Sequence, residues 1–509
     1  MGLMLLLVVL GLLAVPIGER LRLPAPVVAA LFGVLVALLP GGDNIAFPPG
    51  LILPLVLPPL LFTAAWKSSW QRFLKGWSPI LTLAVALVFA TTAAVAFVAS
   101  RIHPALPLGA AVVLGAICAP PDPAAISNVA KRLGVSRRIV TILEGEGLFN
   151  DVTALTIYQV AVVGVLTGSF TWWHAAGNFV YAAVAGVVIG LANAFVFDRL
   201  SNRLGGAELR AGLSLLIPYS AYLAADLAKA SGVLAVLVAG FWIGHSRRDP
   251  DDVEERLYGR SFWEVVEVLV TGFTFGLVGL EFVTVTDRLG GQAWSYVTFS
   301  LIICLVLVLA RFFWMFVVGG IVRFRHRHSE EADIPGNWRE TLLVAWAGMR
   351  AVVTVATALA LPAMFPARDQ IIFVAVVVAL LTLLVPGVTL PALVSALGLN
   401  TGADRRRAAR REVIAAINVA ATGHLDELRR RGEITDAQAD WLTIRWRATL
   451  LESGEEDELA QRYPERHHVK AIHADMLARA RAAALRLRPK EPEAVDEVLR
   501  ELDLRSAVS

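Results

Sequence analysis

The sequence predicts an all-α polytopic membrane protein followed by a helical cytosolic tail, and three observations support this fold class. Hydrophobic residues make up 56% of the 509-residue chain and charged residues 17%, with a mean hydropathy of +0.63. The apolar residues are gathered into long runs. Most charges lie between these runs or after residue 398. This pattern excludes a soluble globular core for the part of the chain before residue 398.

Helices long enough to cross a bilayer account for this first part. About 20 helical residues span about 30 Å of hydrocarbon, and thirteen apolar runs before residue 397 approach that length. They lie near residues 1–17, 24–40, 51–66, 78–100, 106–130, 139–165, 176–197, 209–228, 231–245, 261–282, 295–320, 340–362 and 369–396. The first run lacks a basic flank and a cleavage site, which favours a retained span over a signal peptide. Cys118 and Cys304 fall inside runs, so we expect neither a disulfide framework nor a cysteine metal site.

The distribution of basic residues between the runs predicts the orientation. Alternate loops hold either twenty Lys and Arg residues or only four. The four are Arg101, Lys229, Arg288 and Arg368. Because cytoplasmic loops carry the excess of Lys and Arg, the richer set is cytoplasmic. Thirteen spans then place the N-terminus outside and the tail inside.

Residues 399–509 are rich in Arg, Glu, Ala and Leu with helical spacing, so we expect a transmembrane domain at 1–398 and a cytosolic helical tail at 399–509. Gly432 predicts the end of one helix, and Thr435 with Gln438 predicts a capping box that begins the next. The histidines at 467, 468 and 473 are interpreted as solvated, with a proton sensor or metal site as the alternative.

The sixth run carries the polar cluster that the bilayer tolerates least. It contains Glu144, Glu146, Asn150 and Asp151 within about two helical turns. A carboxylate at the bilayer centre costs roughly 2.5–3.5 kcal/mol, so the cluster requires partners, water or bound cations. Glu146 and Asn150 share one helix face at a spacing of four residues, whereas Asp151 points about 140° away from Glu146.

The fifth run is interrupted by Pro120, Pro121 and Pro123 around Asp122. Proline removes a donor and clashes with the preceding turn, so we expect a broken helix whose free carbonyls line a cavity and can bind a cation. The alternative is a loop between two shorter spans. Counting residues from the predicted cytoplasmic turn places Asp122 and Asp151 at similar depth, both roughly 13–20 Å from that turn if the segments are helical.

Two arginines inside later runs are candidate counter-charges for these acids. Arg311 lies in the eleventh run, and Arg350 follows Gly348 in the twelfth, which Gly348 is expected to interrupt. For Arg311 the alternative is a side chain that reaches the membrane surface from a span end. Transporters built from inverted repeats have interrupted helices at corresponding positions of both halves. Spans five and twelve fit such a plan, with repeats of spans 1–6 and 8–13 in opposite orientation.

These motifs resemble those of the sodium/proton exchangers of the cation–proton antiporter superfamily, in the bacterial NhaP/NHE-like branch that carries an Asn-Asp pair. The family pattern Glu-Ser-Leu-x-Asn-Asp is similar to residues 146–151, and Thr/Ser-Asp-Pro is similar to residues 121–123. Gly-Gly-Leu-Arg-Gly is similar to residues 347–351. Further similarity lies at residues 57–62, 231–235 and 275–280.

The resemblance implies a secondary transporter that exchanges Na⁺, or else Li⁺ or K⁺, for H⁺ by alternating access in the plasma membrane. It implies that Asp151 binds Na⁺ and the proton in turn, with Asn150 orienting it. It implies that Glu146 pairs with Arg311, and that Asp122 lies near Arg350 where the broken helices cross.

The resemblance also implies a homodimer with a role in pH homeostasis, with no enzymatic activity, no cofactor and no nucleic-acid partner. Two departures concern the ion ligands. Gly147 and Pro121 stand where the family often has hydroxyl side chains, so backbone carbonyls or water would supply those oxygens.

Three other functions remain as alternatives. A K⁺/H⁺ antiporter differs only in the ion. A cation channel would require an open polar pathway, whereas the polar groups here concentrate near the middle of the spans. An intramembrane enzyme could use paired aspartates for acid–base chemistry, but the sequence offers no Ser/His dyad or histidine metal motif.

Overall fold

The computed structural model is helical, and the described residues contain no strand. It describes residues 2–21, 23–39, 47–67, 70–104, 106–121, 135, 137–168, 172–201, 203, 207–246, 253–321, 337–348, 352–399, 402–451, 466–488, 491, 494–496, 498–499 and 502. The chain divides into two compact units, Met1–Asn400 and Thr401–Ser509.

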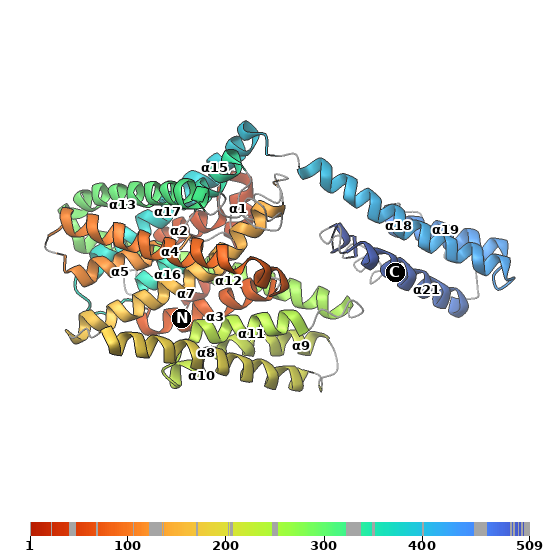
Figure 1. Cartoon of the computed structure of the whole chain (residues 1–509), viewed down its shortest axis with the longest axis horizontal. Helices are drawn as coiled ribbons and strands as arrows, with labels where there is room; N and C mark the ends of the chain where they lie inside the picture. The colour runs from red at the N-terminus through yellow and green to blue at the C-terminus, as the bar shows by residue number, and fades with distance from the viewer. Residues whose placement is uncertain are drawn as a thin grey trace. The chain divides into compact units, whose positions relative to one another are not determined.

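The helices of the first unit follow the apolar runs of the sequence and lie roughly side by side as a bundle (Figure 1). The described helices of its first half are α1 (Gly2–Leu21), α2 (Ala25–Ala37), α3 (Pro49–Lys67), α4 (Trp70–Ile102), α5 (Leu108–Cys118), α7 (Arg137–Thr167) and α8 (Trp172–Ser201). The second half contains α9 (Ala207–Ser214), α10 (Leu216–Leu227), α11 (Gly232–Ser246), α12 (Val253–Leu289), α13 (Ala293–Phe313), α15 (Trp338–Trp346), α16 (Val352–Leu359) and α17 (Arg368–Leu397).

Several of these helices have the length and composition of membrane spans. Six helical stretches in the described part of the chain are long and apolar enough to cross a bilayer, and α2, α5 and α11 are shorter apolar helices. The protein is therefore a multi-pass membrane protein, while the number thirteen stays a prediction. One predicted span, 209–228, is divided into α9 and α10. Pro218 explains the division, because it lacks the N–H that would bond to the carbonyl of Ser214.

Helices end near both positions where the sequence predicts interruptions. α5 ends at Cys118, and residues 119–121 are not helical. α15 ends at Trp346, and α16 begins at Val352 beyond Gly348. The unit therefore contains two helix ends inside the bundle, and α5 and α16 contact each other.

Close backbone contacts fix α12 against the first two helices. A β-carbon at Gly33 of α2 would overlap the carbonyl oxygen of Gly276 in α12, and one at Gly279 would overlap that of Ala30. In α1, a β-carbon at Gly11 would lie 2.9 Å from the backbone of α12. Small residues of this kind let transmembrane helices pack at short range without a hydrophobic driving force from water. These contacts make α1, α2 and α12 one packed element.

The second unit is a helical domain with its own core. Its described helices are α18 (Gly402–Arg430), α19 (Asp436–Leu451) and α21 (Arg466–Leu487). α18 ends before Gly432, whose φ is +71°. The Thr435 N–H donates to Gln438 Oε1 at 2.8 Å and the Gln438 N–H to Thr435 Oγ1 at 3.3 Å, which confirms the predicted capping box. The core lies around Trp446 and Val413.

Candidate functional site

The Asn-Asp pair lies on α7, which runs through the bundle without a break from Arg137 to Thr167. Asn150 is fully buried, whereas the neighbouring Asp151 is half-buried. The difference follows from the helix geometry, because successive side chains point about 100° apart. α7 therefore presents an amide to the packed interior and a carboxylate to a partly open environment.

The end of α5 lies one turn from this pair. Ala119, the first residue after α5, packs in one buried cluster with Ala154 of α7 and Val88 of α4. Ala154 follows Asp151 by three residues. This contact is consistent with the similar depth that residue counting predicts for the proline break and the Asn-Asp pair. Pro121 is buried next to the break.

Arg311 occupies the second interruption. It belongs to α13, is 3% exposed and reaches the C-terminal end of α15. Its Nε donates to the carbonyl of Ala345 at 3.1 Å and its Nη2 to that of Val344 at 3.0 Å. Carbonyls in the last turn of a helix lack intrahelical partners and carry its negative partial charge. The guanidinium of Arg311 supplies these carbonyls with hydrogen-bond donors and offsets their negative partial charge. Its side chain therefore does not extend to the membrane surface.

The surroundings of Arg311 leave no room for adjustment. Gly348 lies against its side chain, so that a β-carbon at that position would overlap Cδ and Nε. Directly after Arg311 the helix widens into a π-helical turn, Trp314–Val318. Such turns are rare and frequent at functional sites. The break in the twelfth predicted span is therefore built around one buried cation.

Several predicted site residues lie outside the described residues. Asp122 and Arg350 belong to this group, as does the side chain of Glu146. The pairings Glu146–Arg311 and Asp122–Arg350 therefore stay predictions. For the first, the structure adds that α7 contacts α15, whose end Arg311 binds.

Two buried hydroxyls escaped the sequence-based reasoning. Thr92 of α4 and Thr354 in the first turn of α16 are each 1% exposed, and neither hydroxyl has a hydrogen-bond partner within the described part of the chain. The backbone of Thr92 lies against Gly115 of α5, and Thr354 follows the second interruption. The sequence signal that could have identified these residues is a threonine within an apolar run next to a predicted broken helix. Buried polar atoms of this kind are normally satisfied by a partner or a water.

The arrangement provides a carboxylate, an amide and helix ends at one depth of the bundle. A half-buried carboxylate can bind a proton or a hard monovalent cation, because oxygen atoms are the ligands such ions prefer. Arg311 neutralises the carbonyl end of α15 and supplies positive charge beside this region. No group of three or more His, Cys, Asp or Glu side chains capable of holding a metal occurs among the residues described.

Comparison with known proteins gives related sequences over the membrane part. Residues 5–396 match the family model for the transmembrane part of sodium/hydrogen exchangers. A sodium, potassium, lithium and rubidium/H⁺ antiporter of Bacillus pumilus is 31% identical over 390 residues, which cover 73% of this chain and 58% of that protein. The Na⁺/H⁺ exchanger YjcE of Escherichia coli, itself uncharacterised, is 32% identical over 398 residues, which cover 73% of this chain and 72% of that protein.

The solved structures agree on the fold. The sodium proton antiporter MjNhaP1 of Methanocaldococcus jannaschii superposes with a TM-score of 0.59 at 20% identity, covering 78% of this chain and 97% of that one. The family match ends at residue 396, before the helices of the second unit. With a family match over most of its length and relatives above 30% identity, the chain belongs to the sodium/hydrogen exchanger family.

Proposed function

We propose that the protein is a secondary transporter that exchanges a monovalent cation, Na⁺ first, for H⁺ across the plasma membrane. The observation that carries this proposal is the position of Asp151, half-buried on α7 one turn from the residue that packs against the end of α5. A carboxylate in this setting can hold either a proton or a cation, and competition between the two couples their movements. Alternating access then exposes the same site to each side in turn.

The other predicted residues take supporting roles in this proposal. Asn150 orients Asp151 or satisfies a helix end, and backbone carbonyls near Pro121 offer oxygen ligands to Na⁺. Glu146 pairs with Arg311, and Arg350 keeps Asp122 ionised. We further propose a homodimer with the N-terminus outside and the tail in the cytoplasm. The orientation rests on the distribution of basic residues between the loops.

Proton flux in vesicles tests the function directly. With the purified protein in liposomes, a pH-sensitive dye should report proton movement after Na⁺ is added, and the comparison of Na⁺, Li⁺ and K⁺ ranks the ions. Asp151→Asn should abolish this flux, because an amide can neither release a proton nor neutralise a cation. Asp226→Asn is the matched control, since Asp226 is exposed at the end of α10. Cation-dependent flux that persists in Asp151→Asn would sink the assignment.

Exchange of K⁺ is the second candidate. It is favoured by the relative from Bacillus pumilus, whose name includes sodium, potassium, lithium and rubidium. It is also favoured by Gly147 and Pro121, because fewer side-chain oxygens leave the selection of ion size to backbone and water. The same vesicle experiment separates the two, since a K⁺/H⁺ antiporter responds to K⁺ at least as strongly as to Na⁺.

A further inference from the structure

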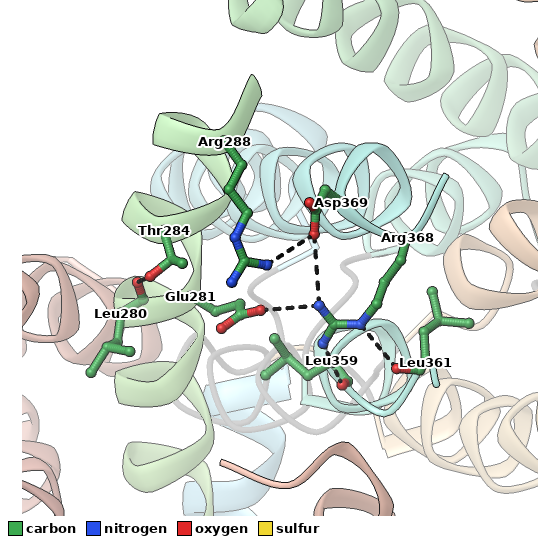
Figure 2. A network of polar contacts seen from close by, with 8 residues as sticks. All are labelled: Leu280, Glu281, Thr284, Arg288, Leu359, Leu361, Arg368 and Asp369. Atoms are coloured by element: carbon green, nitrogen blue, oxygen red, sulfur yellow. Dashed lines mark hydrogen bonds and ion pairs between the residues drawn. The ribbon is translucent and has the colours of Figure 1, made fainter. Parts of the chain in front are cut away.

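A network of charged residues links α12, α16 and α17 (Figure 2). Its centre is Arg368, the first residue of α17, whose Nη1 lies 3.3 Å from Glu281 of α12. Asp369 lies 3.7 Å from the same Nη1 and 3.4 Å from Nη1 of Arg288, also on α12. Two ion pairs thus join the start of α17 to the last turns of α12.

Arg368 also binds the end of the half-helix α16. Its Nε donates to the carbonyl of Leu361 at 3.0 Å, and its Nη2 donates to that of Leu359 at 3.4 Å. α16 ends at Leu359, so these carbonyls belong to the end of the helix and the turn after it. Arg368 therefore binds the carbonyls at the end of α16, as Arg311 binds those at the end of α15. Each half of the interrupted helix ends on an arginine from another helix.

The network lies on the side of the site that the charge distribution assigns to the exterior. Closer to the N-terminus of α12, Glu267 pairs with Lys67, a residue of the predicted cytoplasmic set, at 2.6 Å. Glu281 follows Glu267 by fourteen residues, which is about 21 Å along a helix. The network and the Lys67 pair therefore lie about 21 Å apart along α12.

A buried tyrosine follows Asp151 on α7. Tyr158 lies two turns after Asp151 on α7, about 10 Å further and on nearly the same face. It is buried, at 5% exposure. Because α7 begins at Arg137 in the predicted cytoplasmic turn, Tyr158 lies on the predicted exterior side of Asp151.

The exposure of the ion pairs suits contacts that open and close. Arg368 is 14% exposed and Arg288 55%, so water can replace each partner when the pairs separate. A fully buried pair would leave an uncompensated charge on opening. Arginine is the required residue at 368, because its planar fork serves two carbonyls and a carboxylate together, which a lysine cannot do.

We propose that Arg368 is a positioning residue that holds the exterior end of α16 against α12, and that its ion pair with Glu281 opens once in each exchange cycle to admit or release ions. The proposal rests on the exchange function proposed above. It predicts that a covalent link between α12 and α17 at this point stops exchange, whereas a link between α12 and α3 at Glu267 does not.

Reversible cross-linking tests this prediction. In a background with Cys118→Ala and Cys304→Ala, the pair Glu281→Cys and Arg368→Cys is joined in vesicles by a bifunctional methanethiosulfonate, which binds each thiol through a disulfide that a reductant cleaves. Exchange should fall at least tenfold and return after reduction. The control pair, Lys67→Cys with Glu267→Cys, joins α3 to α12 and should retain exchange when linked. Full exchange by the linked 281–368 pair would overturn the proposal, and so would equal inhibition of both pairs.

A second measurement does not depend on transport. In a Tyr158→Cys variant without the native cysteines, a membrane-impermeant thiol reagent added from the exterior should label position 158 several times faster when Glu281→Gln is also present. Arg288→Gln is the control and should change the rate little, because Arg288 pairs with Asp369 of α17 and makes no ion pair or hydrogen bond with α16 in the described part of the chain. Equal rates in the presence and absence of Glu281→Gln would contradict the proposal.

The two measurements separate this inference from the proposed function. Protein with intact exchange and no response to cross-linking contradicts the role of Arg368 alone. Protein without exchange of any cation contradicts the transport function, while the labelling rates still decide whether the network closes the exterior side. In a transporting protein, Glu281→Gln should also change the ratio of apparent cation affinities at the two membrane sides. A purely structural contact would leave that ratio unchanged.

Discussion

Gly348 lies so close to Arg311 that a β-carbon at position 348 would overlap the Cδ and Nε atoms of the arginine. The same Nε donates to the carbonyl of Ala345 in the last turn of α15. The glycine of the Ala-Gly-Met-Arg segment is therefore required by a neighbouring helix as well as by the interruption itself.

Gly348→Ala should destabilise the membrane unit and reduce exchange. The new methyl group must displace a side chain that is 3% exposed and held by two hydrogen bonds, and overpacking of this kind costs about 1–3 kcal/mol. The measurement is thermal unfolding in detergent together with vesicle flux. Gly212→Ala is the control, because a β-carbon there meets no atom within 4 Å. Equal behaviour of the two variants would show that Arg311 can move freely.

Arg311→Gln should lower stability more than Glu146→Gln. Removal of one member of a buried ion pair costs about 3–5 kcal/mol, and Arg311 additionally binds the carbonyls of Val344 and Ala345. If the two residues interact, the double variant loses less than the sum of the single variants. Unfolding midpoints of the three variants in detergent provide the measurement. Strict additivity would mean that Glu146 has another partner, for which Arg350 is the candidate.

The tail contains a histidine that composition did not single out. His424 of α18 is 6% exposed, and its Nε2 lies 2.6 Å from Asp475 of α21. His424→Ala removes this contact and leaves a cavity, so we expect a loss of about 2–3 kcal/mol in the tail. Faster hydrogen exchange in peptides of α18 and α21 measures it in the full chain. Arg479→Ala, which removes an exposed partner of Asp475, should have little effect.

The features that the sequence predicted have local causes. Pro120 and Pro121 end α5 because proline lacks a donor, and Thr435 with Gln438 begins α19 because both caps lie within one turn. The partners of Arg311 and Arg368 could not be predicted in this way. Backbone carbonyls have no sequence signature, and Glu281 lies 87 residues from Arg368. Helix packing decided which carbonyl or carboxylate each guanidinium reaches.

A further prediction concerns the coupling of cation and proton at Asp151. If the two compete for one carboxylate, protonation removes the charge that attracts the cation. The apparent cation KM should then rise as pH falls, approaching tenfold for each pH unit below the pKa of the site. Measured with Na⁺ in vesicles, a KM that does not change with pH would mean that the proton binds elsewhere.

Competition at one carboxylate also predicts electroneutral exchange of one cation for one proton, since Asn150 cannot titrate. If Asp122 titrates as well, a second proton moves in each cycle and the exchange becomes electrogenic. An arginine within about 4–6 Å favours an ionised carboxylate, so Arg350 should keep Asp122 charged. A K⁺ gradient with valinomycin imposes a membrane potential, and the same gradient without valinomycin is the control for K⁺ as a substrate. A rate that follows the sign of the potential would reject electroneutrality and identify Asp122 as the second proton carrier.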